Sequence, residues 1–232
     1  MSIKKNIVIS VGGSLIVPNQ IDANFLSSLK KTIINQITDQ GYRFVLVAGG
    51  GKTARLYQAA AREVSRLDPE DIDWLGLHAT RLNAHLLRTI FRDQAHPIII
   101  TNPDDVIDVP DSVNLIIAAG YRPGSSTDLR AIQIANHISA GAVINLSNTD
   151  YVFTADPNVD PEAEKIEDTI WSEFRKLIPD KWDPGMSAPF DPIAAKAAEE
   201  SGVEVACLNG NNLDHLNSYL AGKPFVGTRI HN

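Results

Sequence analysis

The chain has 232 residues, of which 44% are hydrophobic and 21% charged, and its formal net charge is −7. This composition is typical of a globular protein and excludes a disordered or fibrous chain. The negative charge disfavours a general nucleic-acid binder, because such proteins neutralise phosphates with clustered lysine and arginine.

Cysteine content and hydropathy indicate where such a chain would work. The one cysteine, Cys207, cannot form an internal disulfide or a multi-cysteine metal site, and its apolar neighbours predict that it is buried. No apolar run approaches the roughly 20 residues of a membrane-spanning helix. Gly12–Ser14 interrupt the apolar stretch that ends at Val11, which favours a first strand over a signal sequence. We therefore expect a cytoplasmic protein without a membrane partner.

The alternation of apolar segments predicts an α/β fold. Short β-branched runs predict strands at Ile7–Val11, Phe44–Ala48, Pro97–Ile100, Leu115–Ala118, Ala142–Leu146, Val203–Leu208 and Phe225–Ile230. Helical patterns lie between most of these runs, so we expect a mainly parallel sheet with helices on both faces, in one domain over residues 1–232. Ligands of such sheets lie beyond the carboxyl ends of the strands.

Apolar stripes and capping signals locate the helices. The first helix is predicted by a stripe of Phe25, Leu26, Leu29, Ile33 and Ile37, and the second by Tyr57, Ala60, Ala61 and Val64. Asp68 before Pro69 predicts the start of a long third helix that reaches about Gln94. Asp191 before Pro192 repeats this signal for a helix at Ile193–Ser201, and another helix is expected at Leu129–Ser139.

Two glycine-rich loops follow predicted strands and precede predicted helices. Gly12-Gly13-Ser14 alone is weak evidence, because a glycine pair after a strand is more often a tight turn. The second loop, Gly49-Gly50-Gly51, leads into Lys52 and Arg55, which share the first helical turn and could meet one anion. Cations are unfavourable at a helix N-terminus unless an anion offsets the dipole, so this loop predicts a phosphate site.

Neither loop has the pattern of a common nucleotide-binding motif. The P-loop motif GxxxxGK[ST] requires glycine at position 46, which is Leu46, so a Walker-type kinase is disfavoured. Neither loop has the sequence GxGxxG, so a dinucleotide site is unsupported.

Three further segments carry polar side chains at strand ends or helix starts. In the loop from Gly120, the residues Ser126, Thr127 and Asp128 fit a helix cap, but an acid beside phosphate loops is useful chiefly for orienting a lysine, a metal or an attacking group. The segment 147–157 combines hydroxyls, carboxylates and two aromatic rings and could accommodate a purine and ribose. Lys196, early in its helix, could either reach a phosphate or lie in solvent.

Taken in order, these segments resemble the amino acid kinase superfamily and, within it, the archaeal-type uridylate (UMP) kinases. The resemblance runs through Gly12–Ser14, Gly49–Arg55, Asp73 ahead of Gly76, Gly120–Asp128, Asn148–Pro157 and Asp191–Lys196, and it covers almost the whole chain. It implies a three-layer αβα sandwich around a mainly parallel sheet, and transfer of the γ-phosphoryl group of ATP to UMP with Mg²⁺. It also implies a homohexamer, assembled as a trimer of dimers.

The resemblance implies a role for each matching residue, with the acceptor in the N-terminal half and ATP in the C-terminal half. UMP would be bound by Gly49, Gly50, Arg55, Asp73, Gly120, Gly124 and Thr127, with the ribose hydroxyls at Asp73. ATP would be bordered by Gly13, Ser14, Asn148, Asp150, Tyr151, Phe153 and Asp156. Catalysis would use Lys196 to neutralise the migrating phosphoryl group, Asp128 to organise the site, and the backbone of Gly12 and Gly13. No metal ligand from the protein is predicted, so Mg²⁺ would come with ATP.

Position 10 separates the possible acceptors. Isopentenyl phosphate, acetylglutamate and aspartate kinases typically carry lysine where this chain has Ser10, whereas archaeal-type UMP kinases lack it. Isopentenyl phosphate kinases also favour a histidine soon after the second glycine loop, and none occurs between Gly51 and Trp74. The alternatives are a kinase for another small phosphate monoester such as isopentenyl phosphate, or a non-catalytic nucleotide- or oxyanion-binding protein. Asp73 could also be a helix-surface acid, and Phe153 a core residue.

Overall fold

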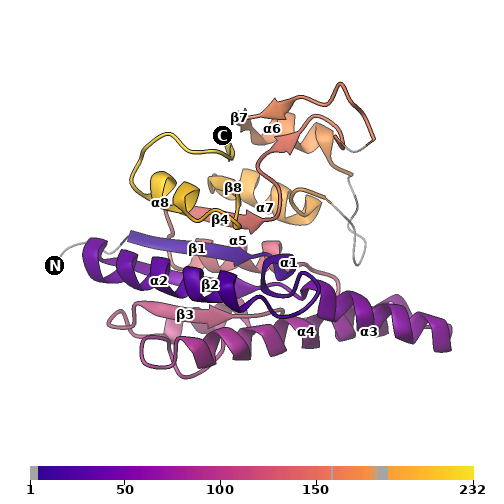
Figure 1. The fold of residues 1–232 in the computed structure, drawn as a ribbon, viewed down its shortest axis with the longest axis horizontal. Coiled ribbons are helices and arrows are strands. Elements are labelled where there is room, and N and C mark those ends of the chain that lie inside the picture. Colours follow the sequence, from indigo (N-terminus) through magenta and orange to yellow (C-terminus); the bar gives the residue numbers. More distant parts are fainter. Residues whose placement is uncertain (1–4, 158, 180, 182–187) are drawn as a thin grey trace.

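A computed structural model of the chain describes residues 5–157, 159–179, 181 and 188–232. Seven strands form one sheet in the order β3-β2-β1-β4-β8-β9-β7 (Figure 1). Their bounds are β1 Lys5–Val11, β2 Tyr42–Ala48, β3 Leu115–Ala118, β4 Ala142–Ser147, β7 Asp168–Ile170, β8 Val205–Asn209 and β9 Thr228–His231. Only the pairing of β8 with β9 is antiparallel in this sheet. Two short strands, β5 (Val152–Phe153) and β6 (Lys165–Ile166), form a separate antiparallel pair.

Helices cover both faces of the sheet. One face carries α1 (Gly13–Ile16), α2 (Ala23–Gln40), α4 (Pro69–Ile90) and α8 (Asp214–Leu220), and the other carries η1 (Pro103–Asp108), α5 (Thr127–His137), α6 (Trp171–Phe174), η2 (Arg175–Leu177) and α7 (Pro192–Ser201). Side chains of β1 alternate between the two cores, with Ile7 and Ile9 in one and Val8 in the other. The predicted three-layer αβα fold with a mainly parallel sheet is therefore confirmed. No helix in the described part of the chain is long and apolar enough to cross a membrane.

The predicted starts of α4 and α7 are confirmed by their caps, whereas α5 begins at Thr127, before the predicted Leu129, and ends at His137. The side chains of Asp68, Asp191 and Ser126 each accept backbone N–H groups of the first turn of α4, α7 and α5. The third predicted helix, α4, ends at Ile90, before the expected Gln94. These caps are local signals, which explains why the sequence alone located them.

The predicted strand at Pro97–Ile100 is wrong. Around this segment, Ala95 and Ile100 each form an isolated bridge to β3 in place of a continuous strand. Pro97 has no N–H group to donate, so the ladder is interrupted between these two points. The strands predicted at Val203–Leu208 and Phe225–Ile230 exist with shifted bounds, as β8 and β9.

The predicted buried stripe of the second helix is also wrong. This helix, α3 (Gly51–Val64), packs against α4 and not against the sheet, as Figure 1 shows where the two helices run together. Tyr57 is 64% exposed and Val64 is 85% exposed, whereas Gln58 is the buried residue of this helix. Cys207 is buried in β8 as expected, and burial raises the pKa of its thiol to about 12.

Candidate active site

The two glycine loops meet at the carboxyl ends of β1 and β2. These strands are parallel neighbours, so their following loops emerge side by side, and the N–H of Gly49 donates to the carbonyl of Val11 at 2.9 Å. A Cβ atom on Gly13 would lie only 2.0 Å from the backbone nitrogen of Gly51. The contact between the two loops therefore requires glycine, apart from any ligand.

A cavity of about 340 Å³ opens beside these loops, and we call it the acceptor cavity. It is lined by Gly13, Ser14, Gly49, Gly50, Gly51, Ala54, Arg55, Gln58, Asp73, Gly76, Leu77, Thr80, Ser125, Ser126 and Thr127. The wall of the cavity is thus formed by the loops after β1, β2 and β3 and by the helices α3 and α4. Of the residues predicted to bind UMP, Gly49, Gly50, Arg55, Asp73 and Thr127 line the cavity, together with Gly13 and Ser14. The predicted cation Lys52 is not among the lining residues.

Asp73 is a buried residue of the cavity wall and not a helix-surface acid. Asp73 is 8% exposed, and its Oδ2 accepts a hydrogen bond of 2.6 Å from the N–H of Gly124. Gly124 has φ of +81°, a conformation that side chains rarely adopt. Burial raises the pKa of the Asp73 carboxyl, and the bond from Gly124 partly opposes this rise. The predicted site residues Asp73 and Gly124 are therefore in direct contact.

Side chains of α4 form hydrogen bonds to the loop that contains Gly49 and to the loop that contains Gly120. The N–H of Gly120 donates to Thr80 Oγ1 at 3.0 Å, and Arg81 donates to the carbonyl of Gly120 at 3.3 Å. Asn83 Nδ2 donates to the carbonyl of Gly49 at 2.7 Å. These residues were not predicted from the sequence. The signal that could have found them is a polar stripe at helical spacing, in which Asp73, Thr80 and Asn83 recur along one side of the helix.

Asp128, at the start of α5, is not among the residues that line the acceptor cavity. Ser10 Oγ donates to Asp128 Oδ1 at 2.9 Å. Burial is the main reason that the pKa of Asp128 rises to about 6; the bond from Ser10 opposes the rise and the charge of Asp191 adds to it. Asp128 is thus coupled to Ser10 and Asp191 in the structure.

Asp191 adds a second carboxylate at this point. Its Oδ1 caps α7, while its buried Oδ2 has no hydrogen-bond partner among the described residues. No group of three or more His, Cys, Asp or Glu side chains that could hold a metal occurs in the described part of the chain. Mg²⁺ commonly takes one or two carboxylates and completes its shell with substrate phosphates and water, so Asp128 and Asp191 fit such a role.

Five of the residues predicted to border ATP lie in the segment 147–157, apart from Gly13 and Ser14, which line the acceptor cavity. Asn148, Asp150 and Asp156 are exposed, while Tyr151 and Phe153 are half-buried and meet edge to face with ring centroids 6.5 Å apart. Phe153 is therefore not a core residue. None of these five residues lines the acceptor cavity.

Lys196 also lies outside the acceptor cavity. Its side chain is 62% exposed, and Nζ lies 3.8 Å from a carboxylate oxygen of Glu200, one turn further along α7. The structure therefore places Lys196 in solvent, on the helix whose N-terminus carries Asp191.

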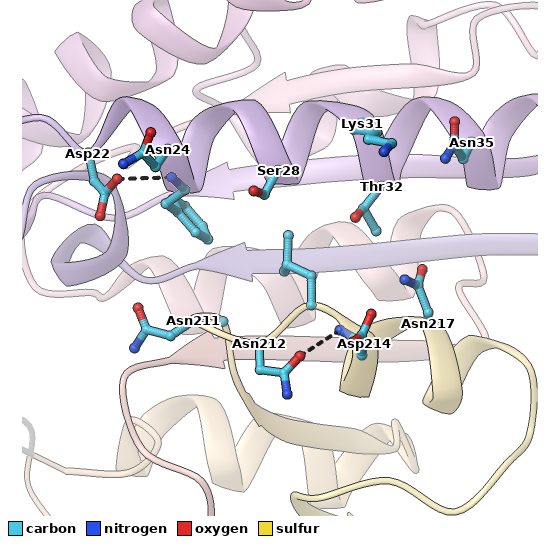
Figure 2. Close-up of a pocket in the computed structure, with 13 residues that line it drawn as sticks. Asp22, Asn24, Ser28, Lys31, Thr32, Asn35, Asn211, Asn212, Asp214 and Asn217 are labelled. Atoms are coloured by element: carbon cyan, nitrogen blue, oxygen red, sulfur yellow. Dashed lines mark hydrogen bonds between the residues drawn. The ribbon is translucent and has the colours of Figure 1, made fainter.

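A second cavity, of about 580 Å³, lies between α2 and the connection from β8 to α8. Figure 2 shows Ser28 and Thr32 of α2 on one side of this space and Asn212 and Asn217 on the other. The hydrogen bonds drawn there are local: the N–H of Asp214 donates to Asn212 at 3.1 Å, and the N–H of Phe25 donates to Asp22 at 2.9 Å. None of the residues predicted from the sequence lines this cavity.

Comparisons with known proteins point to one family. The model of the amino acid kinase family matches residues 5–209. The uridylate kinase of Methanocorpusculum labreanum is 32% identical over 97% of this chain and 95% of its own length. The uridylate kinase of Natronomonas pharaonis is 32% identical, with 97% of each chain covered. The crystal structure of uridylate kinase from Archaeoglobus fulgidus superposes with a TM-score of 0.82 at 29% identity, over 97% of this chain and 99% of that one.

Proposed function

The chain belongs to the amino acid kinase family, and from that premise we propose that it transfers the γ-phosphoryl group of ATP to UMP, giving UDP and ADP. The observation that carries this proposal is the acceptor cavity, in which the glycine loops, the cation Arg55 and the buried acid Asp73 meet. The relatives named uridylate kinase, which align over nearly their full length, support UMP as the acceptor.

We assign the UMP phosphate to the glycine end of the cavity and the ribose to Asp73. Backbone N–H groups and the guanidinium of Arg55 would hold the phosphate. Oδ1 of Asp73 would accept hydrogen bonds from the ribose hydroxyls, while Oδ2 stays bound to Gly124. This arrangement favours a ribonucleotide over its deoxy analogue, because a hydrogen bond to a charged group is worth about 1.5–3 kcal/mol.

In the proposed reaction, an oxygen of the UMP phosphate attacks the γ-phosphorus of ATP in line with the leaving oxygen. The new bond joins that oxygen to phosphorus, the bond to the β–γ bridging oxygen breaks, and the electron pair leaves with ADP. No general base is required, since a nucleotide phosphate is already largely ionised near neutral pH. The protein's contribution is alignment and charge neutralisation.

Two further groups belong to this proposal. Mg²⁺, bound with the phosphates of ATP and near Asp128 and Asp191, would supply positive charge to the transferring group. Lys196 would supply a second cation, for which its side chain has to leave Glu200 and turn toward the phosphates. Residues of the segment 147–157 would border the adenosine.

We also propose a homo-oligomer, a hexamer built as a trimer of dimers. The support on the surface is α3, where Leu56, Tyr57 and Val64 are all more than half exposed. Clustered exposed apolar side chains of this size favour contact with another protein surface. Sedimentation of the intact protein measures the assembly.

The test of the activity is a product assay with Mg-ATP and a panel of acceptors: UMP, CMP, dUMP, AMP and isopentenyl phosphate. We expect UMP to have the highest kcat/KM, about 10-fold or more above dUMP. Asp73→Ala should narrow the UMP to dUMP ratio, while Asp71→Ala, which removes an exposed acid of the same helix, should leave it unchanged. Faster turnover of isopentenyl phosphate would overturn the assignment, and nucleotide binding without any product would indicate the non-catalytic alternative.

A further inference from the structure

A buried arginine stands beside the acceptor cavity without touching it. Arg130, in the first turns of α5, is 3% exposed and is not among the residues that line the cavity. Its Nη2 donates to Ser125 Oγ, its Nη1 donates to Gln133 Oε1, and its guanidinium lies 5.3 Å from the ring centroid of Tyr121. Its Nε is buried without a partner among the described residues.

Packing alone gives no reason for an arginine at this position. A buried guanidinium loses its hydration, and Arg130 forms no ion pair among the described residues that would offset that loss. Burial lowers the pKa of Arg130 and the charge of Arg122 lowers it further, whereas Tyr121 and Asp104 act in the opposite direction. An apolar side chain of similar volume would fill the same space at lower cost, so the arginine has to be explained by what it holds.

What it holds is one wall of the acceptor cavity. Ser125 is 8% exposed and lines the cavity, and its Oγ also donates to the carbonyl of Arg122 at 3.0 Å. We call residues 120–126 the acceptor loop. From α4, this loop is fixed by Asp73 at Gly124 and by Thr80 at Gly120. From α5, the fastening side chain is Arg130, through Ser125.

We propose that Arg130 is a positioning residue of the acceptor site: by holding Ser125, it keeps the acceptor loop in the shape that binds the acceptor. The inference rests on the proposed function, in that the acceptor occupies this cavity. Without Arg130, the loop stays attached to α4 but samples more conformations at Ser125. The acceptor then pays for ordering the loop when it binds, which raises the KM for the acceptor and leaves the KM for ATP unchanged.

The chain offers a matched control. Arg43 in β2 is 4% exposed and also binds local partners, with Nε donating to the carbonyl of Val113 at 3.0 Å and Nη2 to that of Val109 at 3.2 Å. Arg43 lies near the first residue of β2, whereas the glycine loop 49–51 follows the last residue of this strand. Arg43 Nη1 also lies 4.0 Å from a carboxylate oxygen of Asp111. Arg43→Met therefore removes a buried arginine with local partners without touching the acceptor loop.

The kinetic experiment compares Arg130→Met, Ser125→Ala, the double variant and Arg43→Met in the intact protein. We expect the KM for UMP to rise about 10-fold in Arg130→Met, as for loss of one charge-assisted hydrogen bond, with little change in kcat. The double variant should raise the KM by less than the two single changes combined, because the contact between Arg130 and Ser125 is lost in each of them. Additive effects of the two changes, or an equal rise in Arg43→Met, would overturn the proposal. Should Arg130→Met fail to fold, Arg130→Lys and Ser125→Ala carry the same comparison.

A second measurement separates this proposal from the proposed function. Hydrogen exchange of the acceptor loop in the protein without nucleotides should be faster in Arg130→Met than in the wild type and unchanged in Arg43→Met. If UMP is not phosphorylated by the wild type but the loop exchanges faster, the function is wrong and the loop contact stands. If UMP is phosphorylated but exchange and KM are unaltered, the role of Arg130 is refuted.

Discussion

The acceptor side and the donor side of the proposed reaction centre differ in the burial and hydrogen bonding of their residues. On the acceptor side, Asp73 is buried and hydrogen-bonded, and the loops around it are held by side chains of α4 and α5. On the donor side, Asp150 and Lys196 are exposed, and their partners are Asn209 and Glu200 on the surface. If these proposed roles hold, we expect the acceptor site to be preorganised, and the donor residues to reach their working positions only with nucleotide bound.

This comparison predicts its largest effect at Lys196. Lys196→Met should lower kcat about 100-fold or more with little change in UMP affinity, because its contact would form mainly in the transition state. Steady-state kinetics with both substrates measure this. Lys176→Met is the control, since Lys176 is also exposed and paired with a glutamate, at 2.8 Å. Turnover equal to that of the control would remove Lys196 from the site.

Substitution of Arg55 should give a smaller effect, and on UMP affinity rather than on kcat. In Arg55→Ala, UMP affinity should fall about 10- to 100-fold through loss of a charge-assisted contact that exists before the reaction. Titration calorimetry with UMP alone measures this, without ATP. Arg62→Ala, an exposed arginine later in the same helix, should bind UMP normally. A normal affinity in Arg55→Ala would mean that the preorganised side does not use this cation.

The smallest effect should appear in the protonation of Asp128. Because the pKa of this carboxyl in the fold, about 6, lies above its unfolded value, ionisation opposes folding. Its contribution to stability is full below about pH 4, the ordinary aspartate pKa, and is lost as the pH rises through 6. Ser10→Ala removes the donor that favours the charged form, so it should raise the pKa of Asp128 by about 1.

Carbon NMR titration of the Asp128 carboxyl measures this change directly, with Ser28→Ala as the control at an exposed serine. Chemical unfolding between pH 5 and 8 should show the loss of stability extending to higher pH in Ser10→Ala. An unchanged titration would show that Ser10 does not govern the charge of Asp128.

Local sequence signals predicted much of the fold. Caps such as Asp68 and Asp191 act within a few residues, so they located two helices without any tertiary information. The stripe on α3 failed for the opposite reason. Periodicity shows that one side of a helix is apolar, but it does not show whether a sheet, another helix or a second protein covers it.

The candidate site divides in the same way. Arg55 was predicted from its spacing to Lys52 after the second glycine loop, Asp73 was predicted from the family resemblance, and both line the acceptor cavity. The sequence analysis missed Thr80, Asn83 and Arg130. Their side chains form hydrogen bonds to the loops that contain Gly120, Gly49 and Ser125, and no short sequence motif encodes such contacts. The place of Lys196 in its helix left open whether it reaches a phosphate or lies in solvent, and its catalytic role followed from the family resemblance. A long side chain at the surface has several rotamers, and the sequence does not choose among them.

The position of β9 affects how this sheet is completed during synthesis. β9 lies between β8 and β7, and Thr169 of β7 pairs with Ile230 of β9 although a long stretch of chain separates them. β7 therefore leaves the ribosome well before the strand that joins it to the sheet exists. Until β9 is made, β8 has an open edge, and open strand edges are where chains pair wrongly with each other. Slow closure of this long-range pairing makes the nascent chain most open to aggregation just before Thr228–His231 is added.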